Sequence, residues 1–311
     1  MTDDAAPSLP PRPDGGHKGV FGTVAVIGGA ATHTTEDAAG VRMPGAPALT
    51  ALAALRAGAG LARIVAPEPI LNACLLIAPG ATGVPLAVDD VGAPIPHLAA
   101  AAFDEVCDAA DCLAVGPGLG RSAGAQTLVL RALASETPVI LDADGLNNLA
   151  AIPDAARDIH APAILTPHPG EYRRLADAFG VDVPPDDHDA AGALARRLGA
   201  IVVLKSSRTV VSDGLDDWTF DNPNPALGTA GSGDVLTGVI AALVARLFPR
   251  GPRIPGFDPP GAFSLYNCAR LGVRLHAEAG RLWAADHPAR GGMLATDLVD
   301  RLPDAADNLT D

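Results

Sequence analysis

The chain has 311 residues, of which 48% are hydrophobic and only 4% aromatic, so its core is filled mostly by small aliphatic side chains. This composition is typical of helices packed tightly on a parallel sheet. The formal net charge is −14, and dense basic runs are missing from the sequence. We therefore expect neither nucleic acid nor an anionic membrane as a partner.

Cysteine spacing and the first residues indicate the compartment. Cys74, Cys107, Cys112 and Cys268 form no C-x-x-C pair. The N-terminus contains neither the charged nor the apolar region of a signal peptide. No apolar run approaches the roughly 18 residues of a membrane span. These features predict a soluble, cytoplasmic protein.

The chain divides into a leader, one domain and a tail. Residues 1–16 are rich in Pro, Asp and Gly, and their prolines disfavour helices and strand pairing. We interpret them as a flexible leader, followed by a single domain over 17–302 and a tail over 303–311. Two segments, 31–45 and 249–261, are interpreted as excursions from the core.

Short β-branched runs alternate with Ala- and Leu-rich helical stretches through most of the domain. Such alternation predicts βαβ units and a mainly parallel sheet, with helices on both faces. The expected strands are 23–27, 63–66, 112–115, 139–141, 163–166 and 201–205. Two further strands, 209–212 and 217–220, are joined by an Asp-Gly turn and predict a short antiparallel edge.

A helix is expected to begin at Asp234, because apolar residues repeat at helical spacing from there to Leu247. Its other face carries Gly and Ala, which predicts burial almost all round. The sequence GTAGSGD (228–234) leads directly into this helix. Its small residues let backbone N–H groups face an anion, and the helix N-terminus adds positive potential.

Asp234 would lie at the mouth of this anion site, where it could accept a proton from a hydroxyl that attacks a phosphoryl group. The alternative is that Asp234 simply caps the helix. Commoner phosphate motifs are excluded: no G-x-x-x-x-G-K-[ST] occurs, and Arg121 replaces the last glycine of G-x-G-x-x-G in the loop that starts at Gly116.

Other polar or glycine-rich loops follow predicted strands, at 28–29, 116–120, 142–145, 166–171 and 205–209. Taken singly, each could be an ordinary turn or helix cap. Ligands of open α/β sheets collect at the carboxyl ends of the strands. Together the loops would place acidic groups, a lysine and glycine turns on one rim, as a magnesium–nucleotide site requires.

Six segments carry a resemblance to a known family. They are HKG (17–19), PGA (44–46) with ALRAGAG (54–60), VGPGLG (115–120), LDAD (141–144), LTPHPGE (165–171) and GSGD (231–234). In this order the chain resembles the ADP/ATP-dependent NAD(P)H-hydrate dehydratases from about His17 to Leu302. The resemblance implies a ribokinase-like fold and a lyase.

In the implied reaction, ADP or ATP phosphorylates the hydroxyl of the S-epimer of hydrated NADH or NADPH, and phosphate then leaves to restore NAD(P)H. By resemblance, Asp234 is the catalytic base and contacts the hydrate. Gly231, Ser232 and Gly233 form the anion hole beside it. The pattern of the residues alone implies only phosphoryl transfer.

The resemblance also assigns substrate and metal contacts. His168 is implied as a substrate contact, with a purely structural role as its alternative. Ala46 and Gly116 are implied as positions where the chain passes close to the hydrate. Glu171, together with Asp142, is implied to hold Mg²⁺ through water.

The adenine-nucleotide loop is implied to be Lys205, Ser206, Ser207, Arg208 and Thr209, with Gly233 also contacting the nucleotide. Ser206 stands where the family usually has glycine. If that position requires a positive φ, Ser206 carries strain of order 1 kcal/mol. Two further departures are Ala230 in the anion loop and the extra length of 31–43.

Family members often form homotetramers, and many carry an N-terminal epimerase domain, for which the short leader leaves no room. A homo-oligomer and a separate epimerase are therefore expected. Two alternative functions stay open: a ribokinase-like kinase of a vitamin-precursor alcohol, and a catalytically silent nucleotide-binding protein. The sequence does not distinguish ADP from ATP or NADH from NADPH.

Overall fold

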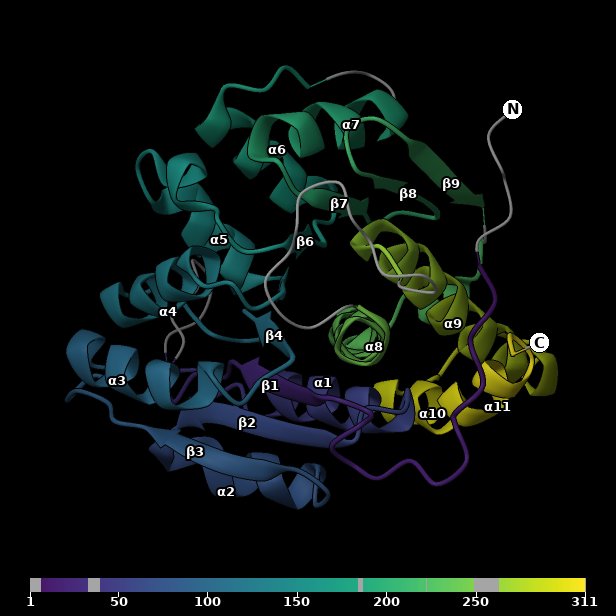
Figure 1. The fold of residues 1–311 in the computed structure, drawn as a ribbon, viewed down its shortest axis with the longest axis horizontal. Helices are drawn as coiled ribbons and strands as arrows, with labels where there is room; N and C mark the ends of the chain where they lie inside the picture. The colour runs from purple at the N-terminus through teal and green to yellow at the C-terminus, as the bar shows by residue number, and fades with distance from the viewer. Residues whose placement is uncertain (1–6, 33–39, 184–186, 222, 249–262, 311) are drawn as a thin grey trace.

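The fold is taken from a computed structural model, which describes residues 7–32, 40–183, 187–221, 223–248 and 263–310. These residues build one nine-stranded sheet with helices on both faces (Figure 1). The strand order is β3-β2-β1-β4-β5-β6-β7-β8-β9. The pairs from β3 to β7 are parallel, whereas β7–β8 and β8–β9 are antiparallel. The expected fold class, including its short antiparallel edge, is confirmed.

The strands are β1 (Thr23–Ile27), β2 (Leu61–Pro67), β3 (Thr82–Leu86), β4 (Cys112–Val115), β5 (Val139–Leu141), β6 (Ala163–Leu165), β7 (Ile201–Leu204), β8 (Arg208–Ser212) and β9 (Asp217–Asp221). All eight expected strands are confirmed within two residues at each end. The sequence analysis missed β3. Gly83 and Pro85 interrupt its pattern, and β3 tolerates proline because it is an edge strand.

The helices cover the two faces in two groups. One group is α1 (Gly45–Arg56), α2 (Glu68–Ile77), α8 (Ser232–Leu247), α9 (Leu265–Asp286), α10 (Ala295–Asp300) and α11 (Leu302–Asp307). The other is α3 (Pro96–Cys107), α4 (Ala123–Ala134), α5 (Asp144–Ala151), α6 (Pro169–Phe179) and α7 (Asp187–Leu198). Short 3-10 turns span Ala155–Asp158 and Pro225–Leu227.

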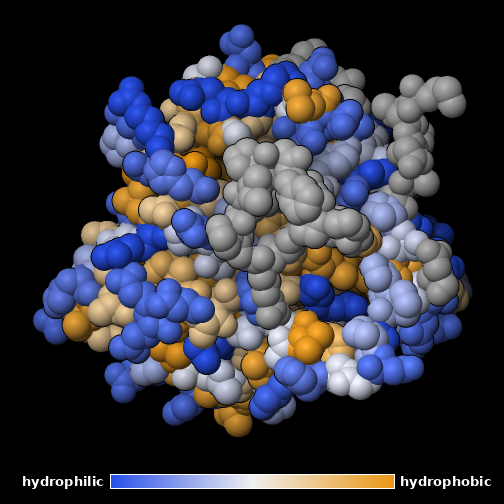
Figure 2. All heavy atoms as spheres, in the orientation of Figure 1, coloured by the Kyte–Doolittle hydropathy of each residue, from blue (hydrophilic) through white to orange (hydrophobic). Residues whose placement is uncertain are grey.

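Each face has its own core, because successive strand residues point to opposite sides of the sheet. In β1, Val24 and Val26 join the core under the α8 group, and Ala25 and Ile27 join the core under the α4 group. Both faces of the central strands are thus buried, which explains their continuous apolar runs. Hydrophilic residues are spread over the molecular face in Figure 2, with smaller groups of hydrophobic residues between them.

Helix α8 lies against the sheet near its middle and is seen almost end-on in Figure 1. Every residue from Val235 to Ala245 is buried, which confirms the expected burial all round. The helix begins at Ser232, two residues before the expected start. Its N-cap is Gly231, at a left-handed φ of 86° that glycine adopts without strain.

Both ends of the described chain meet on the surface. The N-terminal trace runs past α10 and α11 in Figure 1, and the Leu9 amide donates to the Leu309 carbonyl at 2.7 Å. Leu9 is 4% exposed, so part of the predicted leader is packed. Helix α11 overlaps the predicted tail. The predicted excursion at 249–261 and the middle of the one at 31–45 lie outside the described residues, and Gly45 belongs to α1. In the described part of the chain, no helix has the length and apolar character needed to cross a membrane.

Candidate active site

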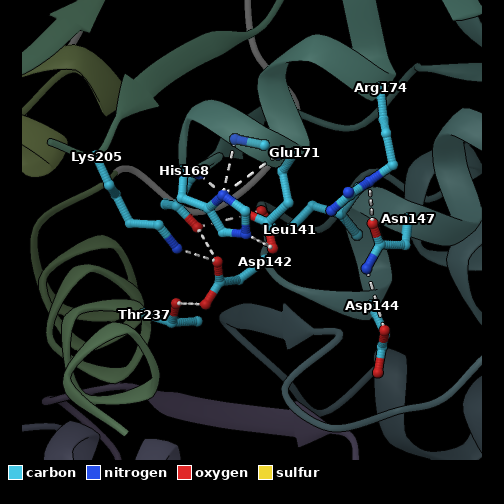
Figure 3. A network of polar contacts seen from close by, with 11 residues as sticks. Leu141, Asp142, Asp144, Asn147, His168, Glu171, Arg174, Lys205 and Thr237 are labelled. Carbon is cyan, nitrogen blue, oxygen red and sulfur yellow. Dashed lines mark hydrogen bonds and ion pairs between the residues drawn. The ribbon is translucent and has the colours of Figure 1, made fainter. Parts of the chain in front are cut away.

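The loops after β5, β6 and β7 meet beside α8, as Figure 3 shows. They bring together Asp142, Glu171 and Lys205, which are far apart in the sequence. Because parallel strands end at the same edge of a sheet, this convergence is a direct result of the topology. The expected gathering of acidic groups and a lysine on one rim is thus observed.

The N-terminal turn of α8 builds the anion-binding element. Gly231 is its N-cap, and a Cβ there would lie 2.8 Å from Leu49 Cδ1 and 2.9 Å from Ala295 Cβ. Glycine is therefore required both for the positive φ and for the tight packing. The N-cap glycine has no side chain to accept from the first N–H groups of the helix, which leaves them available for an anion.

Asp234 lies in the first turn of α8 but does not cap it. Among the described residues, no hydrogen-bond donor contacts its carboxylate. Burial raises the pKa of Asp234 to about 7, with a further increase from the negative charge of Asp142 and an opposing effect from Lys205. Asp234 is therefore suited to accept a proton near neutral pH. Asp234 is therefore not the helix cap that the alternative interpretation predicted.

Asp142 is 2% exposed and is surrounded by donors from three elements. Its Oδ1 accepts from Thr166 Oγ1 at 2.8 Å and from Lys205 Nζ at 2.6 Å, and its Oδ2 accepts from Thr237 Oγ1 at 2.8 Å (Figure 3). Three protein donors therefore occupy most of the roughly four acceptor sites of this carboxylate. About one acceptor site of Asp142 is therefore left for a magnesium-bound water.

Lys205 keeps its charge despite burial. Burial alone would lower the pKa of Lys205, but the carboxylates of Asp142, Glu171 and Asp234 outweigh that effect and raise it. Its side chain is 21% exposed. A Cβ on Gly233 would lie 3.6 Å from the ammonium, so Lys205 stands in front of the first turn of α8.

His168 and Glu171 form a capping box at the start of α6. His168 Nδ1 accepts from the amides of Gly170 and Glu171, and Glu171 Oε2 accepts from the His168 amide at 2.9 Å. Nδ1 is therefore unprotonated and Nε2 carries the hydrogen, 3.4 Å from Glu171 Oε1. Burial raises the pKa of Glu171. His168 thus caps α6, and half of its side chain stays exposed.

A cavity of about 740 Å³ opens beside this cluster. It is large enough for a nucleotide-sized ligand. Five residues of the predicted nucleotide set line it, namely Lys205, Ser206, Ser207, Thr209 and Gly233, together with Ser232 and His168. Apolar residues also line it, including Phe220, Leu227, Leu236 and Val273. Arg208 is exposed and does not line the cavity.

The structure places Ala46 and Gly116 away from this cavity. Ala46 is in the first turn of α1, next to Gly118, whose added Cβ would lie 3.2 Å from Ala46 Cβ. Gly116 has a φ of 120°, and a Cβ there would lie 2.0 Å from the Asp142 carbonyl oxygen. Close packing of two loops therefore explains this glycine. Leu49 of α1 packs against the Gly231 turn and does not line the cavity.

Ser206, which stands where the family usually has glycine, does not carry the backbone strain of a positive φ. The non-glycine residues with positive φ in the described ranges are Ala143, Asp154 and Arg290. Ser206 instead uses its hydroxyl in the loop, accepting from the Arg208 amide at 3.1 Å and donating to the Arg208 carbonyl at 2.8 Å. The serine thus stabilises the turn without a left-handed backbone.

Several site residues were missed from the sequence. Thr166 and Thr237 are buried partners of Asp142. Buried His276 of α9 donates from Nε2 to the Ser232 carbonyl at 3.0 Å, and burial lowers the pKa of His276 to about 4. A threonine inside the apolar pattern of α8 was the available signal, because a buried hydroxyl requires a partner.

Asp144 fixes a neighbouring loop. It accepts from the Gly120 amide at 2.9 Å and from Asn147 Nδ2, while Arg174 donates to the Asn147 side chain (Figure 3). Between Asp142 and Asp144, Ala143 adopts φ 49° and ψ −118°. Such backbone is strained for any residue except glycine.

We expect Ala143→Gly to raise the free energy of unfolding by about 1 kcal/mol, because it relieves this strain at the cost of some unfolded-state entropy. Ala143→Val should lower it by a similar amount or more. Urea denaturation of both variants and the wild type measures the effect. Destabilisation by the glycine variant would show that the turn holds no strain.

The strand order and the helices on both faces of the sheet define an α/β fold of the ribokinase-like class. A family model described as NAD(P)H-hydrate dehydratase matches residues 38–304. The chain belongs to this family.

Known proteins agree with this assignment. The bifunctional NAD(P)H-hydrate repair enzyme Nnr of Moorella thermoacetica is 36% identical over 307 residues, which cover 97% of this chain and 52% of the relative. The chain thus spans about half the length of this relative. The ADP/ATP-dependent NAD(P)H-hydrate dehydratase of Bacillus subtilis, co-crystallised with ATP and Mg²⁺, is 28% identical, with a TM-score of 0.72 and coverage of 97% and 95% of the two chains.

A hydroxyethylthiazole kinase from Pyrococcus horikoshii is also similar in structure. Its TM-score is 0.52 at 16% identity, with 84% of this chain and 94% of the kinase covered. This likeness concerns the fold alone. It shows that a hydroxyethylthiazole kinase shares the architecture, and it does not favour that function for this chain.

Proposed function

We propose that this protein catalyses the nucleotide-dependent dehydration of the S-epimer of hydrated NADH and NADPH. The observation that carries the proposal is Asp234, a carboxylate with a pKa of about 7 beside a glycine-capped helix N-terminus. Family membership supplies the substrate class, because the similar enzymes are named for repairing NAD(P)H hydrate.

The two substrates are proposed to approach Asp234 from different sides. ADP or ATP would occupy the 740 Å³ cavity, with its phosphates at Lys205 and Gly233 and its base among the apolar residues. The hydrate would lie on the side of Ala46, where α1 adjoins the Gly231 turn. Asp234 would then face the hydroxyl that is phosphorylated.

The reaction proceeds in two stages in this proposal. The hydrate hydroxyl attacks the terminal phosphoryl group, its proton passes to Asp234, and AMP or ADP leaves. The phosphate then departs together with a neighbouring ring proton, which restores the ring double bond of NAD(P)H. The sum is loss of water from the hydrate and hydrolysis of the nucleotide. Gly231, Ser232 and Gly233 stabilise charge on the transferred group.

Magnesium would enter with the nucleotide. In the described part of the chain, no group of three or more His, Cys, Asp or Glu side chains is arranged to hold a metal. Mg²⁺ keeps several waters and binds through substrate phosphates and one or two carboxylates, so it needs few protein ligands. Glu171 is the carboxylate proposed to face the hydrated ion, which neutralises phosphate charge when bound.

We expect turnover to increase with pH around neutrality. The base must be deprotonated, and the pKa of Asp234 is raised to about 7, so activity should be lost as the pH falls below that value. The measurement is kcat from pH 5 to 9 at saturating nucleotide, because the terminal phosphate itself titrates near pH 6. A kcat that stays constant from pH 5 to 9 would show that Asp234 keeps an ordinary pKa or is not the base.

Product analysis tests the proposal against an alcohol kinase. Purified protein is incubated with NADH hydrate, Mg²⁺ and either ADP or ATP, and inorganic phosphate and NADH are both quantified. Dehydration predicts one phosphate released for each NADH formed. A stable phosphorylated alcohol without phosphate release, obtained with a thiazole or pyrimidine alcohol instead, would favour the kinase. Nucleotide binding with neither product would indicate a catalytically silent protein.

A further inference from the structure

Asp142 is the centre of the polar network at the site, although it does not line the nucleotide cavity. Its carboxylate joins the end of β5 to Thr166 after β6, to Lys205 after β7 and to Thr237 inside α8. All three partners approach within 2.8 Å of its oxygens. Such charge-assisted hydrogen bonds are the strong ones in a buried setting.

The position of Lys205 depends on this network. Its long side chain has several rotatable bonds and would otherwise sample many conformations. The 2.6 Å bond to Asp142 holds the ammonium in front of Gly233, at the border of the cavity. Asp142 takes one of the three N–H donors of Lys205, and two remain for an anion.

Two features of positive potential therefore converge at one end of the cavity: the Lys205 ammonium and the N-terminus of α8. Phosphate groups bind where such features meet. The two threonines matter as well, because they fix the orientation of the Asp142 carboxylate through bonds to each of its oxygens.

We propose that Asp142 is a positioning residue that holds Lys205 at the phosphate end of the nucleotide cavity, and that it does so without ligating magnesium. This inference rests on the nucleotide binding in the proposed function. It predicts that Asp142 contributes to affinity for phosphate-bearing ligands only, and that its contribution does not depend on Mg²⁺.

The test is calorimetric titration of the full chain with three ligands: ADP with Mg²⁺, ADP with EDTA, and adenosine. Asp142→Asn keeps the shape of the side chain but removes its charge. We expect it to weaken ADP binding about 10-fold both with and without Mg²⁺, about the effect of one charge-assisted hydrogen bond. Adenosine, which has no phosphate, should bind as it does to the wild type.

Asp144→Asn is the matched control, because it makes the same change two residues along the same turn. Asp144 contacts Gly120 and Asn147, not Lys205, so this variant should bind ADP like the wild type. An equal loss of ADP and adenosine affinity in Asp142→Asn would reveal a general structural defect. A loss confined to the Mg²⁺ titration would identify Asp142 as a metal contact instead. Either result, or an unchanged ADP affinity, overturns the proposal.

A second pair keeps the proposal testable if Asp142→Asn folds poorly. Lys205→Met and the double variant Asp142→Asn/Lys205→Met are compared, since the double variant removes both buried charges together. If Asp142 acts through Lys205, Lys205→Met and the double variant should bind ADP with equal affinity. A further 10-fold weakening in the double variant contradicts the positioning role.

These titrations also separate this inference from the proposed function. Wild-type protein that binds ADP but does not dehydrate NADH hydrate would overturn the dehydratase function and leave the positioning role to be decided by the variants. Wild-type protein that binds neither ADP nor ATP would overturn the positioning role itself.

Discussion

Asp234→Asn should lower turnover by about 100-fold or more, the range expected when a general base is lost. Its fold and nucleotide binding should remain close to those of the wild type. Burial disfavours the charged form of this carboxylate, as its raised pKa indicates, so a neutral amide of the same shape costs little stability.

The measurement is kcat with NADH hydrate, accompanied by thermal unfolding and ADP titration. Asp104→Asn is the matched control, because Asp104 is an exposed carboxylate on α3 that pairs with Arg131. It should retain wild-type turnover. If Asp234→Asn turned over as fast as this control, Asp234 would have no part in the mechanism.

Gly116→Ala should lower the free energy of unfolding by roughly 3 kcal/mol, the combined cost of overpacking and of backbone strain. A Cβ at this position would lie 2.0 Å from the Asp142 carbonyl oxygen and 2.4 Å from the Gly145 amide, and the φ of 120° is left-handed. Because both contacts are backbone atoms, no side chain can move aside.

Urea denaturation measures this effect, and Gly45→Ala provides the comparison. A Cβ on Gly45 would meet no atom within 4 Å, and Gly45 has no positive φ. The free energy of unfolding of Gly45→Ala should therefore differ from that of the wild type by about 0.5 kcal/mol or less. Equal stability of the two variants would show that the loops after β4 and β5 are not packed as described.

The strands and the main catalytic candidate could be predicted because their signals are local. β-branched runs separated by helical stretches predicted eight strands, and the glycine-rich turn before an apolar helix predicted an anion site at Asp234. Edge strand β3 was missed because an edge position removes the buried pattern that identifies strands, and tolerates Pro85.

The partners within the site could not be predicted, because they come from distant segments. Thr237 lies 95 residues from Asp142, and His276 lies 44 residues from Ser232, yet both pairs are in hydrogen-bond contact. The resemblance implied a substrate role for Gly116, and the structure adds that close backbone contacts exclude a Cβ at this position. Only the folded chain shows that three protein donors contact the Asp142 carboxylate.

The most direct test of the account is the absorbance of reduced nicotinamide after purified protein is added to NADH hydrate, Mg²⁺ and either ADP or ATP. We predict recovery that requires nucleotide, is retained by Asp104→Asn and is nearly abolished by Asp234→Asn. Absence of recovery with both nucleotides, or equal recovery without any nucleotide, would contradict the assignment of this site as a nucleotide-dependent dehydratase.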